Sequence, residues 1–173
     1  MKRVLTICGL LCALMIGVAA VIAQKGADFA GTWELDKAKS QLPQRQADSI
    51  KSATWTVTQD NKQLTNDQKI EGVEDAGGGG RGMGADALTV KLDGSETTTE
   101  TQGGKLTTKA KWTNDGKTLE ITFVRNGEFQ GNAFTITTTE HWELADDGKT
   151  LKVHRKSETP RGPRESTWVL TKK

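Results

Sequence analysis

The chain has 173 residues, with 24 lysines and arginines against 22 acidic side chains and a formal net charge of +2. A chain so close to neutral has no overall field that attracts nucleic acid, so no nucleic-acid partner is expected. Two histidines are too few for most zinc enzymes, and both cysteines, Cys8 and Cys12, lie near the start of the chain.

The first residues predict a removable secretion signal. Lys2 and Arg3 begin it, an apolar run follows, and Ala23 is the small residue that a signal peptidase needs at its cut. A retained membrane helix is less favoured, because the run is only marginally long enough to span a bilayer. We therefore expect residues 1–23 to be removed and residues 24–173 to form one secreted or periplasmic domain with no stable membrane insertion.

The expected domain is poor in large apolar residues. Leucine, isoleucine, valine and phenylalanine make up 16% of residues 24–173. Such a share is typical of disorder when the net charge is high. Here basic and acidic residues balance at 22 each, five tryptophans are present, and polar and apolar residues alternate. We therefore expect a folded domain.

The alternation predicts strands. Threonine, a strand former, is the commonest residue of the domain, and the prolines at 43, 160 and 163 fall between the alternating runs. Turn dipeptides separate the runs, which is typical of an antiparallel meander. We predict an all-β, up-and-down meander β-barrel of about eight to ten strands, with a short helical segment after the first strand. The expected strands lie near residues 29–36, 52–59, 62–70, 86–92, 95–102, 105–114, 117–125, 128–146, 149–157 and 164–172.

Two-residue turns predict which residues face each other across neighbouring strands. A turn at Asp147-Gly148 places Trp142 opposite Val153 and Glu140 opposite Arg155. The other expected pairs are Trp112 with Leu119 (turn at 115–116), Val57 with Leu64 (60–61), Val90 with Thr97 (93–94), Thr99 with Thr108 (103–104), Ile121 with Asn132 (126–127), and Arg155 with Trp168 (loop 160–163).

These registers give the barrel a mixed inner face. Large apolar residues share it with threonines, asparagines, Glu140, Arg155 and Arg125. The polar set is too large for a dry core, because each unpaired buried polar group costs about 1–3 kcal/mol. The interior is therefore expected to hold water and ligand, or to open to solvent at one end.

A ligand site is expected where the two kinds of inward residue meet. Glu140 and Arg155 could anchor a ligand carboxylate or hydroxyl, or could form an ion pair that seals the barrel end. The tryptophans could wall a pocket or simply fill the core, and Arg125 could be a second anchor or a solvated charge at a strand end. The candidate ligand-binding residues are Trp55, Trp112, Arg125, Thr138, Glu140, Trp142, Arg155 and Trp168.

No catalytic or cofactor motif accompanies these residues. The sequence shows no Ser-His-Asp, Cys-His, paired-carboxylate or metal-ligand pattern, and His141 and His154 point outward by strand parity. The Gly-rich segment 76–84 lacks the Gly-Lys-Ser/Thr ending of a phosphate-binding loop and reads as a solvated linker. We expect neither catalysis nor a cofactor.

The run Phe29-Ala30-Gly31-Thr32-Trp33-Glu34-Leu35 resembles the opening strand of the calycins, the superfamily of lipocalins and fatty-acid-binding proteins. The Phe-x-Gly-Thr-Trp-x-Leu form, the ten strands and the short helical segment are similar to the fatty-acid-binding branch. Segments 31–40, 129–132 and 146–151 resemble small secreted bacterial proteins of lipocalin-like type. That closer likeness implies no established activity.

The resemblance implies a barrel that binds a small apolar or amphipathic molecule. The Arg-x-Tyr carboxylate site of fatty-acid-binding proteins cannot be carried over, because the final strand reads Ser166-Thr167-Trp168 and the chain has no tyrosine. A lipocalin-type basic residue against Trp33 would be Arg155 or Arg164. We expect a monomeric binding protein; the alternative is a structural or protein-interaction module of the cell envelope.

Overall fold

The computed structural model describes residues 26–72, 87–101 and 104–173. The expected signal and the Gly-rich segment 76–84 lie outside these residues. Within them the chain forms ten strands, one α-helix and one 3-10 turn. The elements are β1 (Gly31–Leu35), α1 (Gln44–Ser49), β2 (Ser52–Gln59), β3 (Gln63–Glu71), β4 (Leu88–Lys91), β5 (Thr97–Thr101), β6 (Gly104–Thr113), η1 (Asn114–Gly116), β7 (Thr118–Phe129), β8 (Asn132–Leu144), β9 (Thr150–Thr159) and β10 (Gly162–Lys172).

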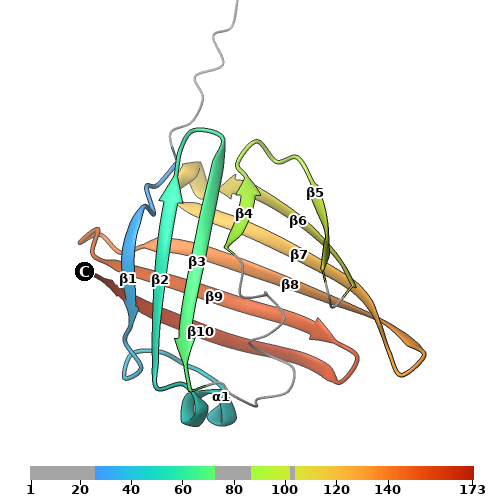
Figure 1. Cartoon of the computed structure of the whole chain (residues 1–173). Coiled ribbons are helices and arrows are strands. Elements are labelled where there is room, and N and C mark those ends of the chain that lie inside the picture. The colour runs from blue at the N-terminus through green and yellow to red at the C-terminus, as the bar shows by residue number, and fades with distance from the viewer. Residues whose placement is uncertain (1–25, 73–86, 102–103) are drawn as a thin grey trace, which may run out of the picture.

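The strands form one antiparallel sheet in the order β4-β3-β2-β1-β10-β9-β8-β7-β6-β5. Strand β1 joins the two halves, since it pairs with β2 on one side and β10 on the other. Strands β1 to β4 cross steeply in front of β6 to β10, so the sheet folds over on itself into a nearly closed barrel (Figure 1). This architecture confirms the predicted up-and-down barrel with a short helix after its first strand.

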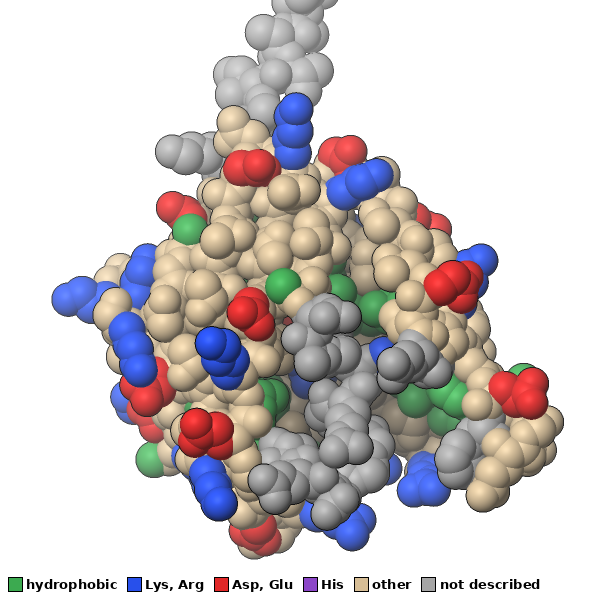
Figure 2. Space-filling view, in the orientation of Figure 1, with side chains coloured by type: hydrophobic (Ala, Val, Ile, Leu, Met, Phe, Trp, Pro, Cys, Tyr) green, Lys and Arg blue, Asp and Glu red, His purple; other side chains and the backbone are tan. Residues whose placement is uncertain are grey.

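Alternating side chains give each strand an inner and an outer face. In β2, Ala53, Trp55 and Val57 are buried, whereas the threonines between them point outward. The same alternation continues around the sheet, so the few large apolar residues collect in one core. The outer face carries basic and acidic side chains that are interspersed over the described surface (Figure 2). Within the described residues, no helix could cross a membrane.

Two predicted registers are confirmed. Trp142 lies opposite Val153, Glu140 opposite Arg155, and Trp112 opposite Leu119. At the first of these hairpins, the Asp147 side chain accepts the backbone N–H groups of Lys149 and Thr150 at 2.7 and 2.9 Å. Leu144 also lies opposite Leu151, so the dipeptide Asp147-Gly148 marks the centre of this hairpin.

Three registers are wrong by two residues, which leaves the inner face unchanged. The observed pairs are Val57 with Asn66, Thr97 with Thr108, and Arg155 with Ser166, while Trp168 faces Val153. At the β2–β3 turn, the Asp60 side chain accepts the N–H groups of Lys62 and Gln63 at 2.7 and 2.8 Å. Gln59 pairs with Leu64 and the Asp60 N–H group donates to the Gln63 carbonyl, so Asp60 precedes the turn instead of occupying its centre.

Two further expectations are wrong. Strand β7 does not turn at Asn126-Gly127 but continues to Phe129, and the chain reverses at Gln130 and Gly131, whose φ angles are 52° and 77°. Ile121 consequently faces Glu140, and Asn132 is exposed at the hairpin tip. Val90 does not pair with Thr97, because β4 and β5 are the two ends of the sheet order.

Candidate functional site

Four tryptophans and a phenylalanine pack together inside the barrel. Trp55 lies between Trp142 and Trp168, with ring centroids 5.4 and 5.5 Å away. Phe29 packs edge-on against Trp142 at 5.8 Å and stacks on Trp112 at 5.9 Å. All of these rings except Trp112, which is half-buried, are at most 1% exposed. Offset and tilted geometries of this kind are favourable for aromatic pairs.

An ion pair completes a closed ring of contacts with three of these tryptophans. The Arg155 Nε–H group donates to Glu140 Oε1 at 2.7 Å, and Nη2 lies 2.6 Å from the same oxygen but off the hydrogen-bond axis. The other carboxylate oxygen, Oε2, accepts the Trp142 Nε1–H bond at 2.8 Å. The Arg155 guanidinium lies 5.7 Å from the Trp168 ring centroid. We call Trp55, Trp142, Glu140, Arg155 and Trp168 the aromatic–ionic cluster.

The aromatic–ionic cluster is assembled from both halves of the sheet. Glu140 and Trp142 come from β8, Arg155 from β9, Trp168 from β10, and Trp55 crosses over from β2. The cluster follows from the alternation of β8, which turns positions 140 and 142 to the same face. The side chain of Glu140 is 1% exposed and that of Arg155 is 15% exposed. Five of the eight candidate residues are thus in direct contact with one another.

Several buried polar atoms of the inner face have no hydrogen-bond partner among the described residues. They are Arg155 Nη2, Trp55 Nε1, Trp168 Nε1, Asn66 Oδ1 and Thr97 Oγ1. The first three belong to the aromatic–ionic cluster, and Asn66 pairs with Val57, two residues from Trp55 in β2. Groups of this kind are rare in native interiors, and each one needs a bonding partner to offset its desolvation.

Toward the far ends of β7 to β9, the inner face becomes polar and more accessible. Thr138 donates to or accepts from the Ser157 hydroxyl at 2.9 Å, and both side chains are half-buried. Arg125 lies between Leu106 and Ile136 across the sheet, on the same face. Partial burial lowers the pKa of its guanidinium, and it forms no ion pair with a described residue. Arg125 and Thr138 are thus inward-facing, and the hydroxyl of Thr138 bonds Ser157 and no member of the aromatic–ionic cluster.

The opposite end of the barrel is covered by the N-terminal segment. The Ala27 N–H group donates to the Gly116 carbonyl at 2.9 Å, and the Gln59 side chain bonds both Ala27 and Phe29. A side chain at Gly26 would clash with the Trp112 ring, which already fills the position of a Cβ. This end is consequently closed by packing.

Two residues of this closed end were missed. Phe29 shares the parity of Trp33 in the first strand, a signal that would have marked it as inward. The basic residue above Trp33 is Lys172, whose Nζ lies 5.2 Å from the ring centroid, in place of Arg155 or Arg164. Lys172 stands directly opposite Trp33 on β10. This contact could be predicted only from the register between β1 and β10, which no turn specifies.

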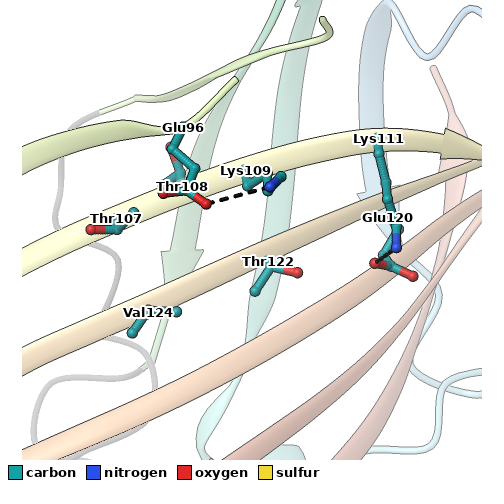
Figure 3. Close-up of a pocket in the computed structure, with 8 residues that line it drawn as sticks. All are labelled: Glu96, Thr107, Thr108, Lys109, Lys111, Glu120, Thr122 and Val124. Atoms are coloured by element: carbon teal, nitrogen blue, oxygen red, sulfur yellow. Dashed lines mark hydrogen bonds and ion pairs between the residues drawn. The ribbon is translucent and has the colours of Figure 1, made fainter. Parts of the chain in front are cut away.

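A separate shallow groove lies on the outer face of β6 and β7 and has a volume of about 280 Å³. Two ion pairs line the groove, Lys109 with Glu96 at 3.4 Å and Lys111 with Glu120 at 2.8 Å, and Val124 lies beyond the first of them (Figure 3). Its charges are already paired with one another, so it offers little to a charged ligand. No group of three or more His, Cys, Asp or Glu side chains in the described residues is placed to hold a metal ion.

Comparisons with known proteins relate the fold to solved barrels. The chain is similar to a zebrafish ileal bile acid-binding protein complexed with cholic acid, with a TM-score of 0.51 and 16% identity over 84% of this chain and 98% of that one. It is also similar to secretory abundant heat soluble protein 4 from Ramazzottius varieornatus, with a TM-score of 0.51 and 12% identity over 86% and 97% of the two chains. No family model and no curated protein matches the sequence. The chain therefore has a calycin-like fold.

Proposed function

We propose that the protein is a secreted or periplasmic binding protein for a small apolar or amphipathic molecule, acting as a monomer and without catalysis. The observation that carries the proposal is the set of unpartnered polar atoms on the inner face, beside a wall of tryptophan rings. A ligand with an apolar body and a few polar groups would pack against the rings by displacing their present neighbours, and would satisfy these atoms.

The polar end of the inner face favours an amphipathic ligand with an acidic group. Arg125 is the inward cation that has no carboxylate partner among the described residues, whereas Arg155 is neutralised by Glu140. An arginine can bind a carboxylate or sulfonate through two parallel hydrogen bonds. The hydroxyls of Thr138 and Ser157 lie on the same face and supply neutral hydrogen-bonding groups. Cholic acid, the ligand of the zebrafish protein, has this combination of an apolar body, hydroxyls and a carboxylate.

A titration followed by tryptophan fluorescence tests the proposal. The protein is titrated with cholate, with a long-chain fatty acid and with the alcohol of the same chain length. We expect a saturable change in emission, because the cluster tryptophans have ring neighbours that a ligand would displace or cover. The Arg125→Gln variant should lose about tenfold in affinity for the acids and little for the alcohol, since a hydrogen bond to a charged group contributes about 1.5–3 kcal/mol.

Lys152→Gln is the matched control, because Lys152 is exposed on the outer face of β9. Its affinities should equal those of the wild type. If no compound changes the emission, and NMR spectra of the protein are also unchanged by each, the binding function is wrong.

The secretion signal is tested separately. Expression in a Gram-negative host followed by fractionation should yield a periplasmic protein whose N-terminal residue is Gln24. A cytoplasmic protein that keeps residues 1–23 would contradict this part of the proposal and would leave the barrel's binding function to be judged by the titration.

One observation favours the alternative of a protein-interaction module. Among the described residues, strand β7 pairs with β6 as far as Asn126, and β8 pairs with β9 from Thr137. Within that part of the chain, the strand residues 127–129 and 132–134 pair only with each other, so the tip of this hairpin extends beyond its described neighbours (Figure 1). Unpaired strand edges can accept a strand from another protein. If this alternative holds, a variant that lacks residues 128–133 should no longer bind a partner protein that the full chain captures from an envelope extract.

A further inference from the structure

The two histidines of the chain are direct neighbours. His141 in β8 and His154 in β9 are cross-strand partners, although 12 residues separate them in sequence. Their ring centroids lie 6.4 Å apart and their planes differ by 23°. Both rings are on the outer face, and the His141 side chain is 40% exposed. Directly opposite Cβ atoms in a sheet are about 4.5–5.5 Å apart, which is close enough for two imidazoles to share one ion.

A carboxylate supports one of the two rings. Glu120, the cross-strand partner of His141 in β7, places Oε2 3.3 Å from His141 Nε2. When His141 Nε2–H donates to this carboxylate, the lone pair resides on Nδ1, which is then free to bind a cation. Histidines that bind metals nearly always donate their other N–H group in this way. The other oxygen of this carboxylate, Oε1, lies 2.8 Å from the Lys111 ammonium, so Glu120 is held from both sides.

The surrounding charges are paired. Lys111 contacts Glu120 at 2.8 Å, and Lys156 lies 3.6 Å from Glu158. Lys152 stands opposite Glu143 in the β8–β9 ladder. On the far side of His154, the register position belongs to the neutral Thr167. The two rings therefore face a nearly neutral surface on which a cation meets little net repulsion.

We propose that His141 and His154 form a binding site for a divalent transition metal, with Glu120 as the positioning residue for His141. Neutral imidazoles bind Cu²⁺, Ni²⁺ and Zn²⁺, and Cu²⁺ binds most strongly in this series. Because the described residues offer no third protein ligand, solvent completes the coordination. Cu²⁺ accepts such a tetragonal arrangement of nitrogen and oxygen ligands, so we assign the site to Cu²⁺ in preference to Zn²⁺.

Titration of the purified protein with Cu²⁺, followed by electron paramagnetic resonance, tests this site. We expect one equivalent to bind with hyperfine coupling from two imidazole nitrogens. The His141→Asn and His154→Asn variants should each show coupling from one imidazole and weaker binding, and the double variant should lose the site. The Glu120→Gln variant should keep the two-nitrogen spectrum but bind about 10–100-fold more weakly. Zn²⁺ should compete with Cu²⁺ only at higher concentration.

Glu165→Gln is the control, because Glu165 is an exposed carboxylate on the same outer face, in β10. It should bind Cu²⁺ as the wild type does. Circular dichroism of each variant verifies the fold, which outward substitutions should leave intact. The site is wrong if the double histidine variant binds Cu²⁺ with unchanged affinity or if the wild-type spectrum shows no imidazole coupling. The fluorescence titration with amphipathic ligands is independent of this result, since the histidines lie on the opposite face of the sheet.

Discussion

Arg155 and Glu140 form a nearly buried ion pair inside the barrel, with Arg155 Nε 2.7 Å from Glu140 Oε1. The carboxylate is 1% exposed, so it depends on Arg155 and on the Trp142 indole for the hydrogen bonds that water would otherwise supply. Losing one member of such a pair leaves the other charge without its partner in a poorly solvated site.

The first prediction follows from this pair. Glu140→Gln keeps the side-chain volume but removes the charge. Its amide has only one oxygen, so it cannot accept the hydrogen bonds of both Arg155 and Trp142 as the two carboxylate oxygens do. We expect the free energy of unfolding to fall by about 3 kcal/mol, at the lower end for a broken buried pair, because Arg155 retains some exposure. Urea denaturation measures the change. Glu165→Gln, exposed on β10, should change it by less than about 0.5 kcal/mol; an equal effect from both variants would show that the pair contributes nothing.

The second prediction compares two buried tryptophans of the aromatic–ionic cluster. Trp142 Nε1 donates to a carboxylate at 2.8 Å, whereas Trp55 Nε1 has no partner among the described residues. Trp142→Phe should therefore cost about 1.5–3 kcal/mol more than Trp55→Phe, because a hydrogen bond to a charged group is lost only in the first. Urea denaturation of the two variants gives the difference directly. A larger loss for Trp55→Phe would mean that its indole N–H group has a strong partner of its own.

The third prediction concerns two glycines with positive φ. Gly104 has φ +107° and a Cβ there would clash with the Asn126 carbonyl oxygen, whereas Gly131 has φ +77° and open space around a Cβ. Gly131→Ala should cost about 1–2 kcal/mol from backbone strain alone. Gly104→Ala should cost clearly more, because the backbone of β7 must also move. Thermal unfolding of the two variants orders them, and equal melting temperatures would contradict the close approach of β6 and β7.

The fourth prediction is a dependence of stability on acid. Backbone N–H groups of the turn, chiefly that of Lys149, hold the pKa of Asp147 below its ordinary value of 3.8. A lowered folded-state pKa means that the contribution to stability is complete above about pH 4 and is lost as the pH falls through the folded-state pKa. The urea midpoint of the wild type should therefore fall more steeply below pH 3.8 than that of Asp147→Asn. An NMR titration of the Asp147 carboxyl carbon that gives a pKa above 3.8 would contradict this.

Sequence patterns were sufficient for the fold and for most of the inner face, with Phe29 and Asn132 as exceptions. Because side chains alternate strictly along a strand, even the three registers that slipped by two residues kept Trp55, Arg155 and Thr97 on the inside. The positions of the turn centres were predicted less accurately than the faces of the strands. An Asp in a turn can occupy the centre, as Asp147 does, or can precede it, as Asp60 does, and in both places its side chain accepts the N–H groups two and three residues further on. The sequence does not distinguish these two uses.

Contacts between strands that are distant in sequence could not be predicted from the turns, because a turn specifies only the pairing of the two strands that it connects. The Glu140–Arg155 pair joins neighbouring strands and could be predicted from one turn. Trp55 meets Trp142 and Trp168 only because the two halves of the sheet fold over each other. Likewise, Lys172 reaches Trp33 through the pairing of the first and last strands. The separation of β4 from β5 also depends on barrel closure, which no local turn encodes.

The most direct test of the binding function is a comparison of an acid with its matched alcohol in the wild type and in Arg125→Gln, followed by tryptophan fluorescence. The account predicts saturable binding of the acid by the wild type, about tenfold weaker binding of the acid by Arg125→Gln, and nearly equal binding of the alcohol by both proteins. Binding of neither compound, with NMR spectra that each leaves unchanged, would contradict the account and identify the aromatic–ionic cluster as a structural core.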